Sequence, residues 1–268
     1  MGLLRDNHIY SYSQLSSFDE CPYMFYLERI EKADQVSNAF AERGTLIHDI
    51  IDQWAKGKLT KEQMLTEYDR RYADEVVTQF PKVLAARGYT EKAYQMGFEY
   101  FLHFDEFSGY KVLSAEEEFK IDLPLTDGTT RPFVGIIDMV MQDELTDELI
   151  ICDHKSKSKS SFKKAEGTMY LQQLIYATYI KQKYGQWPDR MMFNLFNEGG
   201  MKPERPFTEA AYKAAMEWAT EKILQIEEFD TLDWLAAKPE QDFFCVNICS
   251  VRKSCYNGIE QPYQSKNN

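Results

Sequence analysis

The sequence predicts an α/β or α+β fold, with a central mixed sheet flanked by helices. The first observation behind this prediction is the apolar spacing, which is helical over roughly the first 110 residues, changes to short strand-like runs, and then returns to helix. The second observation is size and composition. The chain has 268 residues, of which 44% are hydrophobic and 14% aromatic, so it can bury a large core and is too apolar for a disordered chain.

Helices are expected throughout the N-terminal part. Residues 12–31 are rich in aromatic side chains and are interrupted near Pro22, and Ser13 is the expected N-cap. Residues 40–57 carry apolar side chains at helical spacing, namely Leu46, Ile47, Ile50, Ile51 and Trp54. Two further helical patterns occupy residues 61–75 and 91–107. The sequence thus begins with a helical region.

The middle of the chain has the pattern of strands. Three are expected, at residues 111–123, 132–142 and 148–153. Asp127-Gly128 is a strong signal for a hairpin turn between the first two, and an acidic turn over residues 143–147 joins the second and third. The remaining elements follow in order, with a helix at 167–184, a strand at 190–197, a helix at 208–228 and an irregular segment that holds three cysteines.

Charge and composition exclude several classes of protein. The net charge of −12 argues against a general nucleic-acid binder held by a uniform positive field, but not against an enzyme with a local basic channel. The chain has no apolar run of membrane-spanning length and no apolar signal core near its N-terminus, so we expect a cytoplasmic protein that does not associate with membranes. Its five cysteines, an odd number, do not suggest a disulfide framework.

Two aspartates interrupt apolar strands. Asp138 lies within PFVGIIDMVMQ, and Asp153 lies within ELIICDHK. Burying two carboxylates in a sheet is costly unless a cation compensates them, and Mg²⁺ or Mn²⁺ accepts such oxygen ligands. Lys155, two residues beyond Asp153, projects to the same face of an extended strand, where an ammonium group can orient a water or stabilise negative charge. This arrangement predicts metal-assisted phosphodiester hydrolysis; the alternative is a surface ion pair, with Asp138 as a strand-end cap.

At these residues the sequence resembles the PD-(D/E)XK nuclease superfamily, and within it the RecB-like branch that includes AddB-type and CRISPR-associated exonucleases. GIIDMV and IICDHK match the two core strands of that pattern. The resemblance implies a restriction-endonuclease-like core in which Asp138 and Asp153 are metal ligands and Lys155 is the catalytic lysine. It also implies that the main-chain carbonyl of His154 is a further metal ligand.

Two more motifs resemble the same branch. RGTLIHDII is similar to its Gly-x-x-x-His motif, which implies that His48 is an additional metal ligand and favours Mn²⁺; a structural histidine is the alternative. YLQQLIYATYI is similar to its Gln-x-x-x-Tyr helix, which implies that Gln172 and Tyr176 share one helical face and contact nucleic acid or the lysine. A core helix is the alternative, and Gln173 with Tyr176 or Tyr179 remains open as the operative pair.

Three cysteines, Cys245, Cys249 and Cys255, fall within 11 residues, which indicates a metal or cluster site. Cys21 in DECPYMF resembles the early Cys-Pro motif of iron–sulfur nucleases in this branch, where one early and three late cysteines hold a [4Fe–4S] cluster. Here three residues rather than two separate Cys245 from Cys249, so Cys245 is the least secure ligand, and Zn²⁺ is the alternative occupant. Such a staple would hold the ends of the domain together and stabilise the fold.

The main basic patch of this acidic protein is KSKSKSSFKK, residues 155–164. Its position directly after the catalytic strand makes Lys157 and Lys159 candidates to hold DNA phosphates beside the metal. A solvated loop is the alternative. The three glutamates at residues 116–118 have no assigned role, although one of them would be able to add a carboxylate to the site.

Together these features predict a single nuclease domain over residues 1–268. It comprises a mainly helical part (1–110), a catalytic core (111–200) and a C-terminal part (201–268) whose cysteine segment closes onto Cys21. The expected activity is a metal-dependent exonuclease acting on single-stranded DNA or duplex ends in recombination, repair or viral DNA processing, with a helicase or recombinase as a candidate partner. The alternatives are a non-catalytic DNA-binding or assembly subunit and a zinc-stapled interaction protein.

Overall fold

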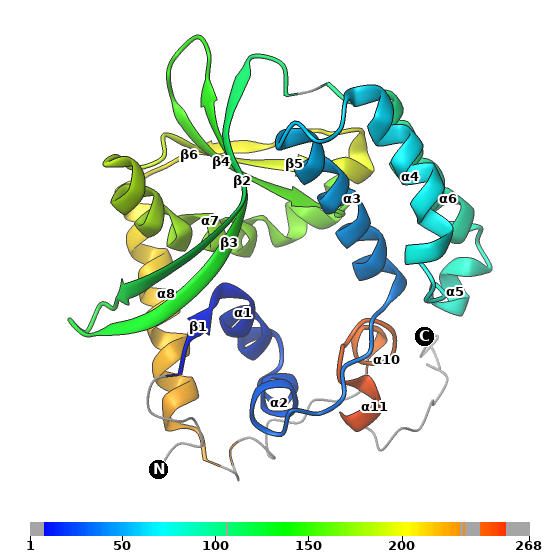
Figure 1. Ribbon diagram of the computed structural model, residues 1–268. Helices are drawn as coiled ribbons and strands as arrows, with labels where there is room; N and C mark the ends of the chain where they lie inside the picture. Colours follow the sequence, from blue (N-terminus) through cyan, green and yellow to red (C-terminus); the bar gives the residue numbers. More distant parts are fainter. Residues whose placement is uncertain (1–7, 106, 231–232, 234–241, 256–268) are drawn as a thin grey trace.

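The described residues form a six-stranded mixed sheet between helical layers, so the predicted fold class is confirmed (Figure 1). The computed structural model describes residues 8–105, 107–230, 233 and 242–255. The strand order is β1-β3-β4-β5-β6, with β2 paired to β3; β1 is parallel to β3 and β4 to β5, and the other pairs are antiparallel. The strands are β1 (Tyr10–Ser11), β2 (Tyr110–Pro124), β3 (Thr130–Asp143), β4 (Leu149–Lys155), β5 (Arg190–Leu195) and β6 (Glu204–Pro206).

Helices cover both faces of this sheet. The group of α3, α4 and α6 packs on one face, and α1, α7 and α8 pack on the other (Figure 1). No described helix is both long and apolar enough to cross a lipid bilayer. The helices are α1 (Tyr12–Glu20), α2 (Pro22–Phe25), the π-helix η1 (Tyr26–Ile30), α3 (Ala39–Ala55), α4 (Lys61–Glu75), α5 (Lys82–Ala85), α6 (Tyr89–Leu102), α7 (Lys159–Tyr184), the 3₁₀ turn η2 (Phe196–Glu198), α8 (Glu209–Glu228), α10 (Phe243–Asn247) and α11 (Arg252–Cys255).

Strand β4 is apolar on both faces because both are covered. Ile150 and Cys152 pack with the layer of α3, α4 and α6, whereas Ile151 packs with the layer of α7 and α8. Alternate residues of a strand point to opposite faces, so a strand covered on both sides carries apolar residues at consecutive positions. Asp153 ends this run and is itself buried, which makes it an unusual residue in the core.

Strands β2 and β3 form a long hairpin around the predicted turn. Gly128 has a φ of +87°, which glycine adopts without a steric penalty, and the Leu125 N–H donates to the Thr129 carbonyl to close the turn. On its other edge β3 pairs with β1 at Phe133 and Val134. The short strand β1 therefore brings the beginning of α1 beside the hairpin.

Two helix beginnings differ from the prediction. Ser11, not Ser13, caps α1, since the Ser11 hydroxyl accepts a backbone N–H from the first turn. Helix α7 begins at Lys159 rather than at residue 167, because Ser158 caps it and the buried Phe162 anchors its first turns. The lysine-rich patch is therefore loop up to Ser158 and helix after it. Its Lys–Ser composition concealed the helix beginning.

Two further boundaries also differ. The helix predicted to reach residue 107 ends at Leu102. The segment with the late cysteines is folded as two short helices, α10 and α11, rather than being irregular. The prediction thus extended one helix by five residues and missed two helices of five and four residues.

The C-terminal end of the described chain lies beside the beginning of α3. The Asn38 side chain, which caps α3, donates to the Ile248 carbonyl at 3.0 Å, and the Arg252 guanidinium donates to the Ser37 carbonyl at 2.7 Å. The segment with the late cysteines thus holds the linker that leads into α3. Residues 256–268 of the predicted C-terminal part lie outside the described residues.

Candidate active site

Three carboxylates lie side by side across the sheet. Glu116 on β2 is opposite Asp138 on β3. On the other side of Asp138, the pairing of β3 with β4 ends at Met139 and Cys152, and Asp153 is the next residue of β4. Like charges at neighbouring cross-strand positions destabilise a sheet unless a cation lies between them. The register alone therefore marks this row as a candidate cation site.

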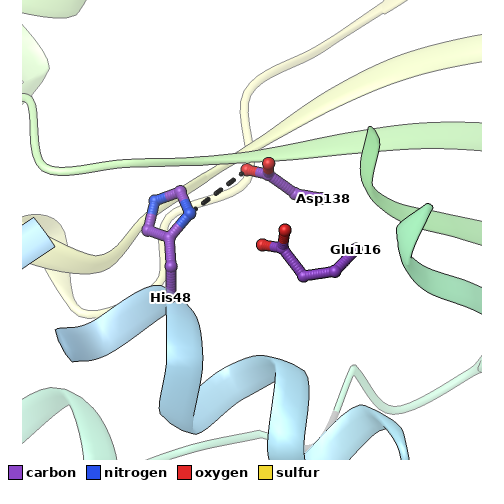
Figure 2. A group of neighbouring side chains, drawn as sticks. All are labelled: His48, Glu116 and Asp138. Carbon is purple, nitrogen blue, oxygen red and sulfur yellow. Dashed lines mark ion pairs between the residues drawn. The ribbon is translucent and has the colours of Figure 1, made fainter. Parts of the chain in front are cut away.

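His48 approaches this row from α3. Its Nδ1 lies 3.5 Å from Asp138 Oδ2, and Figure 2 shows the side chains of His48, Glu116 and Asp138 pointing toward one another. One ligand atom from each of the three lies within 4.8 Å of the others. An imidazole nitrogen and two carboxylates are a donor set that fits Mn²⁺ or Mg²⁺.

The electrostatics of this group suit a cation. Burial lowers the pKa of His48, so its imidazole is neutral and able to coordinate. Burial alone raises the pKa of Asp138, but the neighbouring imidazoles and Lys155 bring it below its usual range, so this carboxylate is ionised. Burial and then the charge of Asp138 raise the pKa of Glu116 to about 7. Because burial and Asp138 disfavour the ionised form of Glu116, a cation bound next to it would strongly stabilise that form.

Asp153 and Lys155 form an ion pair, with 2.6 Å between Lys155 Nζ and Asp153 Oδ2. The two side chains share one face of β4, as residues two apart on a strand do. Burial, opposed by Lys155, raises the pKa of Asp153 to about 7. Burial also opposes the charge of Lys155, but Asp153 and Asp138 outweigh it and raise the Lys155 pKa above its usual value. Lys155 is therefore protonated.

His154 lies between these two residues and serves the site through its backbone. Its N–H donates to Asp138 Oδ2 at 2.8 Å and so fixes that carboxylate. Its ring is buried, with Nδ1 3.0 Å from the Asn194 amide, which also donates to the Tyr100 hydroxyl at 2.8 Å. Burial lowers the pKa of His154 to about 3, so the ring is neutral and accepts from Asn194. Coordination by the His154 carbonyl stays a prediction.

An open groove of about 1120 Å³ begins at this group and passes between α3 and the β2–β3 hairpin. Its wall at α3 includes Phe40 and Thr45, and its hairpin wall includes Lys120 and Ile136. The remaining lining residues come from β1, α1, the β4–α7 loop and α7, and among them are Ser11, Ser13, Ser156, Gln172 and Tyr176. Hydroxyls, an amide and apolar side chains thus line the path that leads to the carboxylates.

Gln172 and Tyr176 lie on the groove side of α7. The ring of Tyr176 packs directly on Gly135, where an added Cβ would lie 2.8 Å from Tyr176 and 2.6 Å from the ring of Phe119. Only glycine leaves room for both rings at this position. The glycine of the GIID motif therefore shapes the groove rather than a turn.

The alternative pairing of α7 residues has a different environment. Gln173 is buried and donates to the Met192 carbonyl at 2.7 Å. Tyr179 donates its hydroxyl to Glu117 on β2. Of the pairs that the sequence left open, Gln172 and Tyr176 are the two that line the groove together.

Two lysines of the basic patch follow the groove-lining Ser156 in the sequence. Lys157 is half-buried in the loop after β4, and Lys159 is exposed at the first position of α7. The Glu198 carboxylate accepts the Lys159 N–H at 2.9 Å and so offsets the unfavourable lysine charge at this helix N-terminus. Both lysines are close in sequence to Ser156, which lines the groove.

Four cysteines gather at a second place. Cys21, Cys245, Cys249 and Cys255 line one small cavity together with Met24, Phe244 and Val251. Burial raises the pKa of Cys245 to about 11 and that of Cys249 to about 12, so these thiols are protonated until a cation replaces the protons. Among the described cysteines no three sulfur atoms lie within 4.8 Å of one another. Four thiolates around one cavity fit either zinc or an iron–sulfur cluster.

Comparison with known proteins identifies the family. The sequence profile of the PD-(D/E)XK nuclease superfamily matches residues 9–256. The chain belongs to this superfamily. Asp153, His154 and Lys155 are the residues predicted to form the D-x-K motif of that name. No curated protein matches the chain.

Among solved structures, one similar to this nuclease is a crystal structure of a protein from Eubacterium rectale that is provisionally described as an exonuclease. The two chains are 12% identical, and the match covers 88% of this chain and 91% of the other with a TM-score of 0.42.

Glu116 was not among the predicted site residues, although the sequence contains a signal for it. Glu116 and Asp138 are equally far from Asp127, the centre of the predicted hairpin turn. Counting back along both strands from that turn places the two carboxylates opposite each other. The structure brings Glu116 and Asp138 together with His48, and it places Asp153 and Lys155 immediately beside them.

Proposed function

We propose that this nuclease is a metal-dependent deoxyribonuclease that acts as an exonuclease on DNA ends. The observation that carries the proposal is the group of His48, Glu116 and Asp138 beside the Asp153–Lys155 ion pair, at the end of an open groove. Metal ligands, a fixed lysine and a path for a polymer are the parts that metal-assisted hydrolysis of a phosphodiester requires. The proposed setting is recombination, repair or viral DNA processing, with a helicase or recombinase as partner.

The donors of the proposed metal site come from four elements of the fold. A bound Mg²⁺ or Mn²⁺ would supply Lewis-acid polarisation of the scissile phosphate and activation of the attacking water. The rigid sheet and helix α3 hold the donors in place before any ion binds, which limits the reorganisation that binding requires. The proposed ligands are His48, Glu116, Asp138, Asp153 and the main-chain carbonyl of His154.

Lys155 has a different role from the metal ligands. Because its pKa is raised, its side chain is an ammonium group and not a base. Its contact with Asp153 fixes Nζ beside the carboxylate row. We therefore assign to Lys155 the stabilisation of negative charge on the phosphate and the orientation of the attacking water.

The groove is the proposed path of the DNA. Gln172 and Tyr176 lie on its wall and offer an amide and a phenol to a sugar or a phosphate. Lys157 and Lys159 follow the catalytic strand and offer positive charge on a protein whose net charge is −12. Binding by this small patch would depend strongly on salt.

For the cysteines we propose a [4Fe–4S] cluster held by Cys21, Cys245, Cys249 and Cys255. The support is that all four line one cavity, as a cluster with four thiolate ligands requires. Iron and sulfide analysis of protein purified without oxygen tests this assignment. Stoichiometric zinc without iron would show that the four cysteines form a zinc site and not a cluster site.

Cleavage of end-labelled DNA tests the proposed activity. Single-stranded and duplex substrates are incubated with Mn²⁺ and either wild-type protein or Lys155→Ala, with Lys213→Ala, an exposed lysine of α8, as the matched control. We expect stepwise products from the wild type and Lys213→Ala, and a loss of about 10³-fold with Lys155→Ala. The label that disappears first gives the polarity.

Two results would contradict the proposal. One is equal trace cleavage by wild type and Lys155→Ala, which would indicate a contaminant. The other is no cleavage by folded, metal-loaded protein that still binds DNA. That second result would favour the non-catalytic DNA-binding subunit.

A further inference from the structure

The loop that follows the catalytic lysine is held at both ends by one short turn. Residues 156–158 connect β4 to α7 and carry no buried apolar side chain. The Asn197 side chain donates to the Ser156 carbonyl, and the Lys159 N–H donates to Glu198 Oε1 at 2.9 Å. Asn197 and Glu198 are neighbours in η2, directly after β5. This turn therefore sets the path of the chain as it leaves Lys155.

Asn197 is in turn held by Arg43 of α3. Arg43 Nη1 donates to Asn197 Oδ1 at 2.6 Å, and the guanidinium carbon lies 5.7 Å from the centre of the Phe196 ring. Arg43 is only 2% exposed, and the Tyr68 hydroxyl of α4 lies next to its guanidinium group. Burying a guanidinium without a carboxylate partner costs free energy. The value of its contact with Asn197 is therefore that it fixes a position, not that it adds net stability.

The chemistry of Arg43 fixes the orientation of the Asn197 amide. A guanidinium group has five N–H donors and no acceptor, so it can face only the oxygen of an asparagine side chain. The amide nitrogen of Asn197 then faces the other way, toward the Ser156 carbonyl. Without Arg43, either the oxygen or the nitrogen of the Asn197 amide would be free to face the loop. The buried arginine thus selects the one orientation that ties the loop to η2.

We propose that Arg43, acting through Asn197, is a positioning residue that holds the main chain at Ser156 and thereby fixes Lys155 relative to the metal ligands. Arg43 and His48 lie on the same helix, so α3 carries a metal ligand and also anchors the end of the strand that bears the lysine. A displacement of a catalytic group by about 1 Å is enough to reduce a rate by about 10²-fold. The effect on cleavage rests on the proposed function, whereas the anchoring of the loop does not.

Substitutions at Asn197 separate positioning from simple stability. Asn197→Ala removes both contacts. Asn197→Asp keeps an oxygen for Arg43, now as an ion pair, but has no N–H for the Ser156 carbonyl. We expect kcat to fall about 10-fold to 100-fold in both variants with KM within about twofold, even though Asn197→Asp regains the stability lost in Asn197→Ala. Arg43→Met should lower kcat in the same way.

Hydrogen exchange measured by mass spectrometry provides a readout that does not need cleavage. Peptides covering residues 152–159 should exchange faster in Asn197→Asp and Arg43→Met, because the last β4–β5 pair, Lys155 with Leu195, loses the anchor beyond it. Thr220→Val is the control: it removes a buried hydroxyl that donates to the Met216 carbonyl in α8. It should lower stability without changing either kcat or exchange at 152–159.

The outcomes are distinguishable. Recovery of wild-type kcat in Asn197→Asp would overturn the positioning role, as would unchanged exchange at residues 152–159. Faster exchange in the variants of a protein whose wild type does not cleave DNA would support the anchor and refute the proposed function.

Discussion

The candidate active site and the four-cysteine cavity are both sets of potential metal ligands, yet they are built differently. Three carboxylates of the active site are fixed by strand pairing in a sheet covered on both faces, and His48 is held on a helix of 17 residues. The cysteines come from helices of four and five residues and from their flanks, more than 200 residues apart in the sequence. No three of these described sulfur atoms converge to 4.8 Å.

The difference shows which site depends on its ion for structure. The donors of the candidate active site are already gathered by the fold, so an ion bound there would supply chemistry and add little order. The cysteine donors belong to elements too short to be stable alone, so an ion or cluster there would supply order. We therefore expect loss of the ion at the candidate active site to reduce activity, and loss of the ion or cluster at the cysteines to reduce stability.

Cys249→Ser should have the largest effect. It removes a buried sulfur between α10 and α11 that shares a cavity with Cys21. Loss of the occupant should release the ends of the domain and lower the melting temperature by about 10 °C or more. Thermal unfolding and metal analysis measure the two effects. Cys152→Ser, at a buried cysteine on the other face of the sheet, should leave the metal content unchanged. Equal metal content in Cys249→Ser would show that these cysteines are ordinary core residues.

Asp138→Asn should abolish cleavage without unfolding the protein. The amide oxygen can still accept the His154 N–H, but a metal ligand loses its charge. We expect cleavage to fall by about 10³-fold or more and the melting temperature without metal to stay within about 3 °C of wild type. Asp122→Asn, at an exposed residue of the same hairpin, is the control. Near-normal cleavage by Asp138→Asn would remove this residue from the site.

Glu116→Gln should have opposite effects on stability and on metal binding. The pKa of Glu116 is about 7 in the folded chain, above the value of about 4.3 for an unfolded chain, so its charge opposes folding above that range. Without metal, the variant should therefore melt at a higher temperature than wild type at pH 8 and at the same temperature at pH 4. Its affinity for Mn²⁺ should fall about tenfold by calorimetry.

The control for this comparison is Glu144→Gln, at an exposed position of the β3–β4 turn. It should change neither quantity. A stability gain at both pH values would mean that the charge of Glu116 is not the cause.

Gly135→Ala should have the smallest effect, confined to the groove. The added methyl would lie within 3 Å of the Phe119 and Tyr176 rings, so Tyr176 has to move. We expect KM for DNA to rise about threefold to tenfold with metal affinity unchanged. Gly167→Ala is the matched control, since nothing lies within 4 Å of a Cβ there and the change favours the helix. An unchanged KM would show that Tyr176 does not contact DNA.

The sequence predicted the sheet well because its signals are local. The Asp127-Gly128 turn and the apolar runs around Asp138 and Asp153 correspond to β2, β3 and β4 within a few residues. Counting residues back along both strands from this turn would also have identified Glu116 as the residue opposite Asp138. Without that register, the three consecutive glutamates cannot be told apart. A hairpin turn supplies that register, so this omission was avoidable.

Other parts of the site could not be found in this way. Arg43 has the appearance of a polar residue on an amphipathic helix, and its contact with Asn197 of η2 forms only when a segment 154 residues later in the sequence folds against it. The beginning of α7 was hidden because the burial of Phe162 depends on the core around Phe193 and not on local propensity. Contacts between distant segments leave no periodic signal.

The hydrogen bond from Asn38 to the Ile248 carbonyl has a consequence for biosynthesis. Asn38 leaves the ribosome early, but its partner is made more than 200 residues later, about 10 to 40 s at ordinary rates of translation. The cap itself is local, because Asn38 Oδ1 accepts the Ala41 N–H, but the contact that ties this cap to the C-terminal segment forms among the last contacts of the domain. A nascent chain interrupted before residue 248 would therefore carry α3 with its cap but without the contact that holds the linker before it.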